Sequence, residues 1–334
     1  MGGGGARRTV ARMTSRRSRA LRAAVSTASA ALLLGGLAAC GDDGEPTAST
    51  STPSSTPSAA EERDGSSREG TRESDYPTYV ALGDSYTSAP FVPETDRGDG
   101  CLRSSGNYPS LVAEELGSEL VDVSCAGAQT VSLVGAQQTF DGETRPAQFD
   151  ALDDDTDLVT VGIGGNDLGL FSKLTAGCVA AADEETGGTP CTDAATGTAT
   201  ADLDRISERV TSALIGVQDR APRARVVLVG YPQLIPAEGS CPALLPLAEG
   251  DLPFARTVNR GLADALENAA EAADVEYVDT FALSRGHDIC ADDPWVNGQV
   301  NDPERALAFH PFAAGQEAVA DELLRLLEKP VPNA

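Results

Sequence analysis

The fold of this chain is decided by the stretch Tyr79-Val80-Ala81-Leu82-Gly83-Asp84-Ser85-Tyr86, where an apolar run stops at glycine, aspartate and serine. A short apolar run bounded by a turn signal is typical of a strand that is buried on both faces. The glycine allows a tight turn after the strand. Open α/β sheets bind ligands at the carboxyl ends of their strands. Ser85 is therefore a candidate functional residue, although a serine at this junction can also simply cap a helix.

Further apolar runs alternate with helical patterns along the rest of the chain. Strands are expected at 79–82, 120–123, 158–163, 225–230 and 275–278, and helices at 109–116, 202–219, 254–273 and 313–327. Near-continuous apolar strands between helices predict a parallel sheet that is covered on both faces. With right-handed crossovers, this pattern predicts a three-layer α/β/α sandwich with a flavodoxin-like sheet. Two cysteine-containing stretches, 175–200 and 286–303, are interpreted as surface excursions.

The N-terminal segment has the pattern of an export signal. It combines seven arginines, a short apolar stretch at 23–39 and the sequence Leu37-Ala38-Ala39-Cys40-Gly41. We interpret residues 1–40 as a lipoprotein signal peptide, with Cys40 lipidated and the protein held outside the cytoplasm at the membrane. An ordinary cleavage site with an incidental cysteine is the alternative. Residues 41–75 are predicted to form a disordered Ser/Thr/Pro-rich tether, and 76–330 the folded domain.

The formal charge of the chain is −26, and the residues after Cys40 carry −33, because the first forty contain seven arginines and no acid. Phosphate binding needs basic patches, so this charge argues against a nucleic-acid partner. It also argues against electrostatic attraction to anionic lipid. Membrane contact is therefore expected only through the lipid anchor, and the tether with its single anchor suits a monomer.

The cysteines also indicate export. Apart from Cys40 there are six, an even number that is typical of a disulfide framework in an exported protein. Several pairings are possible, and proximity in the sequence favours Cys101–Cys125, Cys178–Cys191 and Cys241–Cys290. A zinc site is the competing interpretation, but the chain has no CxxC pair and only two histidines. We expect no metal and no cofactor.

Three other segments supply chemistry that a nucleophilic serine needs. A serine requires a base and hydrogen-bond donors for the oxyanion that forms when it attacks an ester. His310, in Phe309-His310-Pro311, precedes the last expected helix and is the candidate base. Gly127 and Asn166, each after an apolar strand, are candidate oxyanion donors together with the backbone N–H of Ser85. Both donor segments can equally be plain turns.

These four segments, in this order, resemble the SGNH hydrolase superfamily, also called GDSL esterases/lipases. The family's Ser, Gly, Asn and His blocks match Ser85, Gly127, Asn166 and His310, and the resemblance spans roughly residues 79–320. The chain is also similar to exported actinobacterial members with three disulfides. The resemblance implies a serine esterase in which Ser85 is the nucleophile and His310 the base.

One position departs from the family pattern. Many members carry an aspartate three residues before the histidine, where this chain has Leu307. Some members use a backbone carbonyl instead, and we expect the carbonyl of Leu307 to accept the Nδ1 proton of His310. Asp302 lies farther back and is less well placed. His287, the other histidine, is either part of the site or an ordinary loop residue.

We therefore predict a secreted serine esterase or lipase that acts through an acyl-enzyme. Acetyl-sugar hydrolysis and envelope acyl transfer are alternatives on the same residues, and a cell-surface binding module built on a hydrolase scaffold is the non-enzymatic alternative. The substrate is expected to be a lipid or short acyl ester. Either an acyl pocket or ordinary loop packing accounts for the apolar residues Tyr86, Phe91, Leu168, Phe171 and Trp295.

Overall fold

A computed structural model describes residues 74–184, 187–195 and 198–330. The expected signal peptide, Cys40 and nearly all of the tether lie outside these residues. The central sheet has five parallel strands in the order β2-β1-β5-β6-β7. This is the flavodoxin-like order, so the predicted fold class is confirmed.

The sheet is built from the apolar runs of the sequence. Its strands are β1 (Thr78–Gly83), β2 (Glu119–Asp122), β5 (Leu158–Gly162), β6 (Arg225–Val229) and β7 (Glu276–Val278). β1, β5 and β6 lie inside the sheet and are buried along nearly their whole length, whereas the edge strand β2 alternates exposed and half-buried residues. Gly83 is paired with Gly162, so β1 and β5 end side by side. The chain therefore leaves two central strands at one point of the sheet edge.

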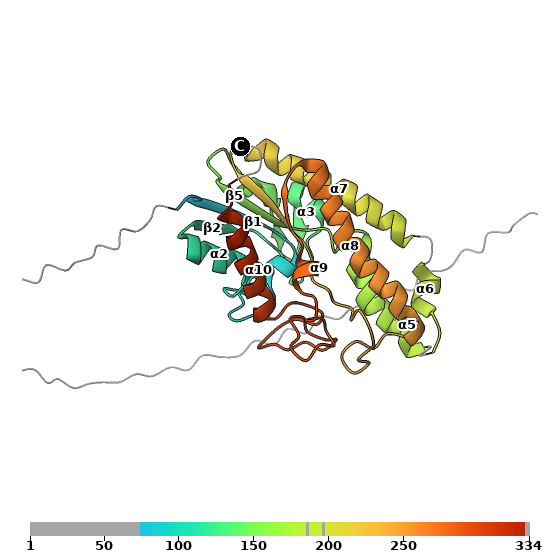
Figure 1. Cartoon of the computed structure of the whole chain (residues 1–334). Helices are drawn as coiled ribbons and strands as arrows, with labels where there is room; N and C mark the ends of the chain where they lie inside the picture. Colours follow the sequence, from blue (N-terminus) through green and yellow to red (C-terminus); the bar gives the residue numbers. More distant parts are fainter. Residues whose placement is uncertain (1–73, 185–186, 196–197, 331–334) are drawn as a thin grey trace, which may run out of the picture. The chain divides into compact units, whose positions relative to one another are not determined.

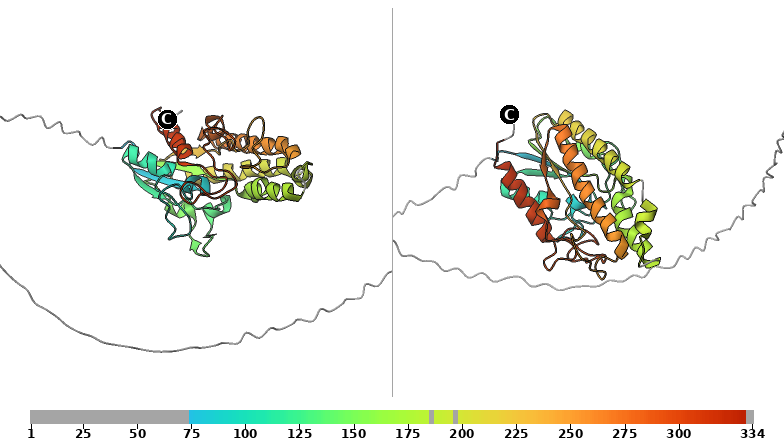
Figure 2. Two further views of the ribbon diagram at one scale, coloured as in Figure 1. Left: turned by 90° about the horizontal axis from the view of Figure 1, so that it is seen from below. Right: turned by 45° about the vertical axis from the view of Figure 1, so that its right-hand side comes forward.

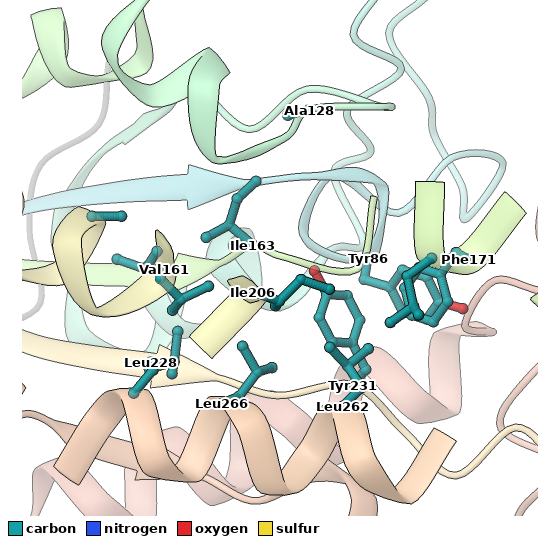
Figure 3. Packing of buried hydrophobic residues seen from close by; sticks show 14 of the residues in the cluster. Tyr86, Ala128, Val161, Ile163, Phe171, Ile206, Leu228, Tyr231, Leu262 and Leu266 are labelled. Carbon is teal, nitrogen blue, oxygen red and sulfur yellow. The ribbon is translucent and has the colours of Figure 1, made fainter. Parts of the chain in front are cut away.

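Helices cover both faces of this sheet, as Figures 1 and 2 show. α2 (Tyr108–Leu116) and α10 (Ala313–Leu327) pack on one face, against a cluster that includes Tyr79, Val227 and Leu323. On the other face lie α3 (Thr130–Val134), α7 (Ala199–Arg220) and α8 (Leu252–Ala273). The larger core lies under α7 and α8, and Figure 3 shows part of it, with Tyr86, Tyr231 and Phe171 grouped at one end.

Shorter elements fill the connections. They are α1 (Ser85–Ser88), the strands β3 (Gln137–Gln138) and β4 (Thr144–Arg145), η1 (Gln148–Ala151), η2 (Asp167–Gly169), α4 (Leu170–Ser172), η3 (Lys173–Gly177), α5 (Cys178–Glu184), α6 (Pro190–Ala195), η4 (Glu249–Asp251) and α9 (Thr280–Leu283). β3 and β4 form an antiparallel hairpin that is separate from the main sheet. The stretch interpreted as a surface excursion from residue 175 is thus largely helical.

Three disulfides join Cys101 to Cys125, Cys178 to Cys191, and Cys241 to Cys290. These are the pairings that sequence proximity favours, and such bonds persist in oxidising compartments outside the cytoplasm. Cys178 and Cys191 link the short helices α5 and α6, whereas the other two disulfides fasten loops at the carboxyl ends of the strands. Among the described helices, none has the length and hydropathy that crossing a bilayer requires.

Candidate active site

Ser85 is held at the end of β1 by local backbone geometry. Asp84 caps the four-residue helix α1, and its Oδ1 accepts the backbone N–H of Tyr86 at 2.9 Å. Gly83 has no room for a side chain, because a Cβ there would lie 2.2 Å from Oγ1 of Thr87 and 2.8 Å from the carbonyl oxygen of Gly162. The close pairing of the two strand ends therefore requires glycine and sets where Ser85 lies.

His310 meets Ser85 from a loop more than two hundred residues away in the sequence. Its Nε2 lies 2.7 Å from Oγ of Ser85, and its Nδ1 lies 2.7 Å from the carbonyl oxygen of Ala308. With the proton on Nδ1, the imidazole donates to this carbonyl and Nε2 accepts the serine proton. This arrangement is a Ser–His pair whose histidine is oriented by a backbone oxygen.

The prediction that the carbonyl of Leu307 accepts the Nδ1 proton of His310 is wrong, because the carbonyl of Ala308 takes that place. The carbonyl of Leu307 instead accepts the backbone N–H of His310 at 3.1 Å and the Nδ2 amide of Asn297 at 3.2 Å. Phe309 adopts a left-handed backbone conformation with φ +61°, which is uncommon for a residue with a side chain. We attribute the choice of the Ala308 carbonyl to this turn, because the chain reverses between Leu307 and His310. Asp302 pairs with Ala306 within the loop.

Tyr86 contacts both the imidazole and the loop that carries it. Its ring stacks on His310, with centroids 5.0 Å apart and planes at 29°, and its hydroxyl donates to the carbonyl oxygen of Phe309 at 2.6 Å. The same ring stacks on Phe171 and meets Tyr231 edge-on (Figure 3). The sequence suggested Tyr86 only as a pocket residue, and nothing in the sequence signals its contact with His310.

The predicted oxyanion donors lie on three segments that contact one another beside Ser85. Among the described residues, neither the backbone N–H of Ser85 nor that of Gly127 donates a hydrogen bond. Gly127 has φ +80°, a conformation that favours glycine. Asn166 donates from Nδ2 to the carbonyl oxygen of Ala128 at 3.0 Å and makes a longer contact of 3.4 Å to Oδ2 of Asp84. The three donors thus come from the ends of β1, β2 and β5.

Asp84 is a fully buried carboxylate beside the serine. Tyr231 donates to its Oδ2 at 2.6 Å, and the same hydroxyl accepts the backbone N–H of Gly165 at 2.8 Å. Burial raises the pKa of Asp84 to about 7, and the hydrogen bonds from Tyr231 and the Tyr86 backbone oppose that rise. Asp84 therefore links the serine turn, through Tyr231, to the segment that carries Asn166.

The imidazole of His310 is held in its neutral form by its surroundings. Burial lowers its pKa to about 4, and the hydrogen bond to the Ala308 carbonyl opposes this shift only in part. A neutral imidazole has a free lone pair on Nε2, which a general base needs. The site is thus ready to accept a proton from Ser85 at neutral pH.

The other candidate residues lie around this centre. His287 stacks on Trp295, with ring centroids 4.0 Å apart, and its Nδ1 contacts the carbonyl oxygen of Asp293, so it does not join the Ser–His pair. Tyr86 and Trp295 both line a pocket that extends toward α10. Phe91 packs under the guanidinium of Arg97. In the described part of the chain, no group of three or more His, Cys, Asp or Glu side chains is arranged to hold a metal ion.

A serine, a neutral histidine and converging N–H donors at the strand ends of a flavodoxin-like sheet define the class of the site, that of a serine hydrolase. Residues 81–318 match the GDSL-like Lipase/Acylhydrolase family. The chain belongs to this family and is an ester hydrolase of the GDSL lipase/esterase type, so the resemblance drawn from its four sequence blocks is confirmed.

Individual relatives agree with this assignment. The chain is 39% identical over 259 residues to Lipase 2 of Streptomyces coelicolor, covering 75% of this chain and 85% of that protein. It is 30% identical over 251 residues to a lipase of Streptomyces rimosus, covering 71% and 82%. Among solved structures, phospholipase A1 from Streptomyces albidoflavus NA297 superposes with a TM-score of 0.64 at 30% identity, covering 75% of this chain and 99% of that one.

Proposed function

We propose that this protein hydrolyses carboxylic esters outside the cytoplasm through an acyl-enzyme on Ser85. The observation that carries the proposal is the 2.7 Å contact between Oγ of Ser85 and Nε2 of a neutral His310. His310 takes the serine proton as Oγ bonds to the ester carbonyl carbon. It then gives that proton to the departing alcohol. Water attacks the acyl-enzyme by the same route and releases the acid.

The negative charge of the tetrahedral intermediate needs donors. We propose the backbone N–H groups of Ser85 and Gly127 and the Nδ2 amide of Asn166. The contact of this amide to Asp84 is long, so we expect this N–H to turn to the substrate oxyanion. The imidazolium that forms at His310 is stabilised by the Ala308 carbonyl rather than by a carboxylate, so the pair acts as a dyad.

Lipid esters are the substrates that the relatives favour, because a lipase and a phospholipase A1 are among them. We propose a lipid or short-chain acyl ester as the substrate and a monomeric enzyme, with Cys40 lipidated and anchored in the membrane. Mass spectrometry of the mature N-terminus tests the lipid on Cys40. A free N-terminus at another residue would contradict anchoring.

The function is tested by hydrolysis of p-nitrophenyl esters from acetyl to palmitoyl. We expect Ser85→Ala and His310→Ala each to lower kcat by about a thousandfold or more. His287→Ala is the matched control and should retain activity, because that ring contacts neither Ser85 nor His310. No turnover, with no labelling of Ser85 by a phosphonate ester, would favour a binding module. Transfer of the acyl group to a sugar in preference to water would favour the acyltransferase.

A further inference from the structure

Large apolar side chains that remain exposed are few in the described part of the chain, and they are unevenly placed. Five of the seven lie on segments next to the candidate site, and we call these five the apolar rim. They are Val131, Val134, Phe140, Leu244 and Val300. The other two are Val121 on β2 and Ile215 on α7. Exposed apolar residues that gather in this way mark an interaction surface, whereas scattered ones do not.

Phe140 is at the tip of the β3–β4 hairpin, and 76% of its surface is exposed. Its ring lies against the oxyanion segment, because a Cβ added at Gly127 would come 3.4 Å from its Cζ. Gln137 fastens the hairpin to this segment, donating from Nε2 to the carbonyl oxygen of Ala126 at 2.9 Å. An exposed phenylalanine is therefore held beside a proposed oxyanion donor.

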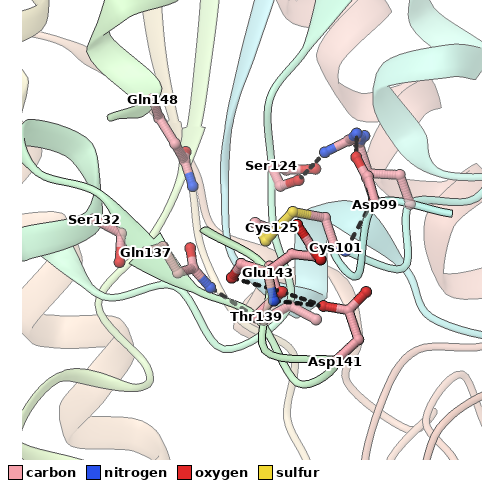
Figure 4. The surroundings of a disulfide bond; sticks show 12 residues. Asp99, Cys101, Ser124, Cys125, Ser132, Gln137, Thr139, Asp141, Glu143 and Gln148 are labelled. Atoms are coloured by element: carbon pink, nitrogen blue, oxygen red, sulfur yellow. Dashed lines mark hydrogen bonds and ion pairs between the residues drawn. A yellow bond between two sulfur atoms is a disulfide. The ribbon is translucent and has the colours of Figure 1, made fainter. Parts of the chain in front are cut away.

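The turn of the hairpin is itself well ordered by hydrogen bonds, as Figure 4 shows. The backbone N–H of Thr139 donates to the carbonyl oxygen of Glu143 at 2.9 Å, and its hydroxyl donates to the carboxylate of Asp141. The Cys101–Cys125 disulfide lies next to the hairpin and fixes the loop before Gly127. Several polar contacts thus order a turn that carries an exposed phenylalanine.

An exposed apolar residue also lies near the loop that carries His310. Val300 is 70% exposed, and it follows Gly298, whose carbonyl accepts the backbone N–H of Phe309 at 3.0 Å. Leu244 lies beside Gly298 and accepts the backbone N–H of Gln299 at 2.9 Å. The Cys241–Cys290 disulfide fastens the Leu244 segment. Apolar tips therefore border the site next to both Gly127 and His310.

The charge around the rim restricts what can cover it. Asp141 and Glu143 follow Phe140, and Asp302 and Glu304 follow Val300. Hydrogen bonds from Thr139 and Glu143 lower the pKa of Asp141, so this carboxylate is ionised at neutral pH. The residues after Cys40 carry −33 in total. An anionic surface would be repelled, so the occupant is apolar and carries no net charge.

We propose that the apolar rim docks the enzyme on the surface of uncharged or zwitterionic lipid aggregates, so that ester groups enter the site from the lipid phase. This inference rests on the proposed esterase function and adds the physical state of the substrate. Phe140 and Val300 insert among the lipid chains on either side of the Ser85 hydroxyl. The flanking carboxylates remain in water and direct the enzyme away from anionic surfaces.

The test measures binding to vesicles of phosphatidylcholine with the full chain carrying Cys40→Ser, so that no lipid on that cysteine contributes. Ser85→Ala is added for the binding measurements to prevent hydrolysis. We expect the double variant Phe140→Ser/Val300→Ser to lower the partition coefficient by about tenfold or more. Ile215→Ser removes an exposed apolar side chain of α7 that is not part of the rim, and it should leave binding unchanged. Replacing part of the phosphatidylcholine by phosphatidylglycerol should weaken binding, most strongly at low salt.

A second readout separates this proposal from the esterase proposal. With Ser85 present, the double variant should hydrolyse dissolved p-nitrophenyl acetate at nearly the unmodified rate but lose activity on emulsified esters. Unmodified protein that turns over the dissolved ester without binding vesicles would overturn the rim proposal alone. An equal loss of binding in Ile215→Ser, or binding that grows with anionic lipid, would also overturn it. No turnover of the dissolved ester by unmodified protein would instead overturn the esterase proposal.

Discussion

At the scale of single residues, no carboxylate of the described residues contacts the imidazole of His310, whose Nδ1 faces the Ala308 carbonyl instead. A neutral carbonyl stabilises a catalytic imidazolium less well than an anion does. Tyr86 supplies two contacts that partly compensate: its ring face lies on the imidazole, and its hydroxyl holds the carbonyl of Phe309. A ring face attracts a nearby cation at centroid distances below about 6 Å. Tyr86 is therefore a positioning residue, since it acts through His310.

Two substitutions separate these contacts. Tyr86→Phe keeps the stacked ring and removes the hydrogen bond to Phe309, so we expect kcat to fall by about five- to tenfold, as for a net loss of about 1 kcal/mol. Tyr86→Leu also removes the ring and admits water, so kcat should fall further. The pKa of His310 should then rise toward its ordinary value. Steady-state kinetics over a range of pH measures both effects, and an unchanged pH profile in Tyr86→Leu would contradict this role.

The low pKa of His310 also predicts how activity depends on pH. Burial lowers the pKa of His310 to about 4, so the base stays neutral at pH values where an ordinary histidine is protonated. Activity should therefore persist at pH 5–6 and fall only as the pH decreases through about 4. The measurement is kcat/KM for p-nitrophenyl acetate, with circular dichroism as a check on folding. If activity is already half lost near pH 6.5, the pKa of His310 is not lowered as described.

The pH dependence of kcat/KM also needs a control for the ionisation of Asp84. Its pKa is raised to about 7, so its ionisation can add a second transition near neutral pH. Asp84→Asn removes this transition and leaves the transition near pH 4 in place. A transition near pH 7 that persists in Asp84→Asn belongs to another group.

At the scale of elements, one buried carboxylate ties the two oxyanion segments together. Asp167, fully buried at the start of η2, accepts the backbone N–H of Thr130 at 2.9 Å and its hydroxyl at 2.6 Å. Arg209 on α7 completes the group, with Nη1 2.9 Å from Oδ1 of Asp167. Thr130 lies three residues after Gly127, and Asp167 directly follows Asn166. The relative position of two proposed donors thus depends on this cluster.

Arg209→Leu tests that dependence. Removing one partner leaves a buried charge with less compensation, and Arg209 is partly exposed, so we expect the free energy of unfolding to fall by about 2 kcal/mol. We also expect kcat to fall. Arg205→Leu is the matched control, because its 3.7 Å ion pair with Asp202 is longer, its guanidinium is more exposed than that of Arg209, and Asp202 keeps its contact with Lys173. It should change stability by less than about 0.5 kcal/mol. Urea unfolding and kinetics distinguish the two variants, and equal effects would remove any special role of Arg209.

The elements also show what sequence patterns can and cannot predict. Strands such as β1 and β5 are predictable because they are buried on both faces and leave an unbroken apolar run. The β3–β4 hairpin has only two residues in each strand, too few for a pattern, and depends on the contact of Gln137 with Ala126. The helices between residues 170 and 195 follow Leu168 and Gly169, both with positive φ, which a helical pattern does not anticipate.

The site shows the same division. Short motifs at a strand end and before a helix predict Ser85 and His310, which the structure brings together, whereas the oxyanion roles of Gly127 and Asn166 stay predictions. The acceptor for the imidazole was predicted one residue away, at Leu307, because the choice of carbonyl depends on the left-handed turn at Phe309. That turn is held by contacts from Gly298, in the preceding loop, and from Tyr86, which lies far from it in the sequence.

At the scale of the whole molecule, two disulfides should stabilise the fold to a similar extent but differ in whether they adjoin the candidate site. Cys101–Cys125 closes a loop of 24 residues and Cys178–Cys191 one of 13, so each should stabilise the fold by about 3 kcal/mol in the chain-entropy description. Only the first adjoins the site, because the loop that Cys125 ends continues directly to Gly127. Cys178 and Cys191 join two helices that contribute none of the proposed catalytic groups.

Paired serine substitutions exploit this difference. Cys101→Ser/Cys125→Ser and Cys178→Ser/Cys191→Ser should each lower the free energy of unfolding by about 3 kcal/mol. Under conditions in which both variants are folded, only the first should lower kcat, because it frees the Gly127 segment. Its KM for a small dissolved ester should change less, since the lost contact acts on the transition state. Equal losses of kcat in both variants would mean that the disulfides support activity only through stability.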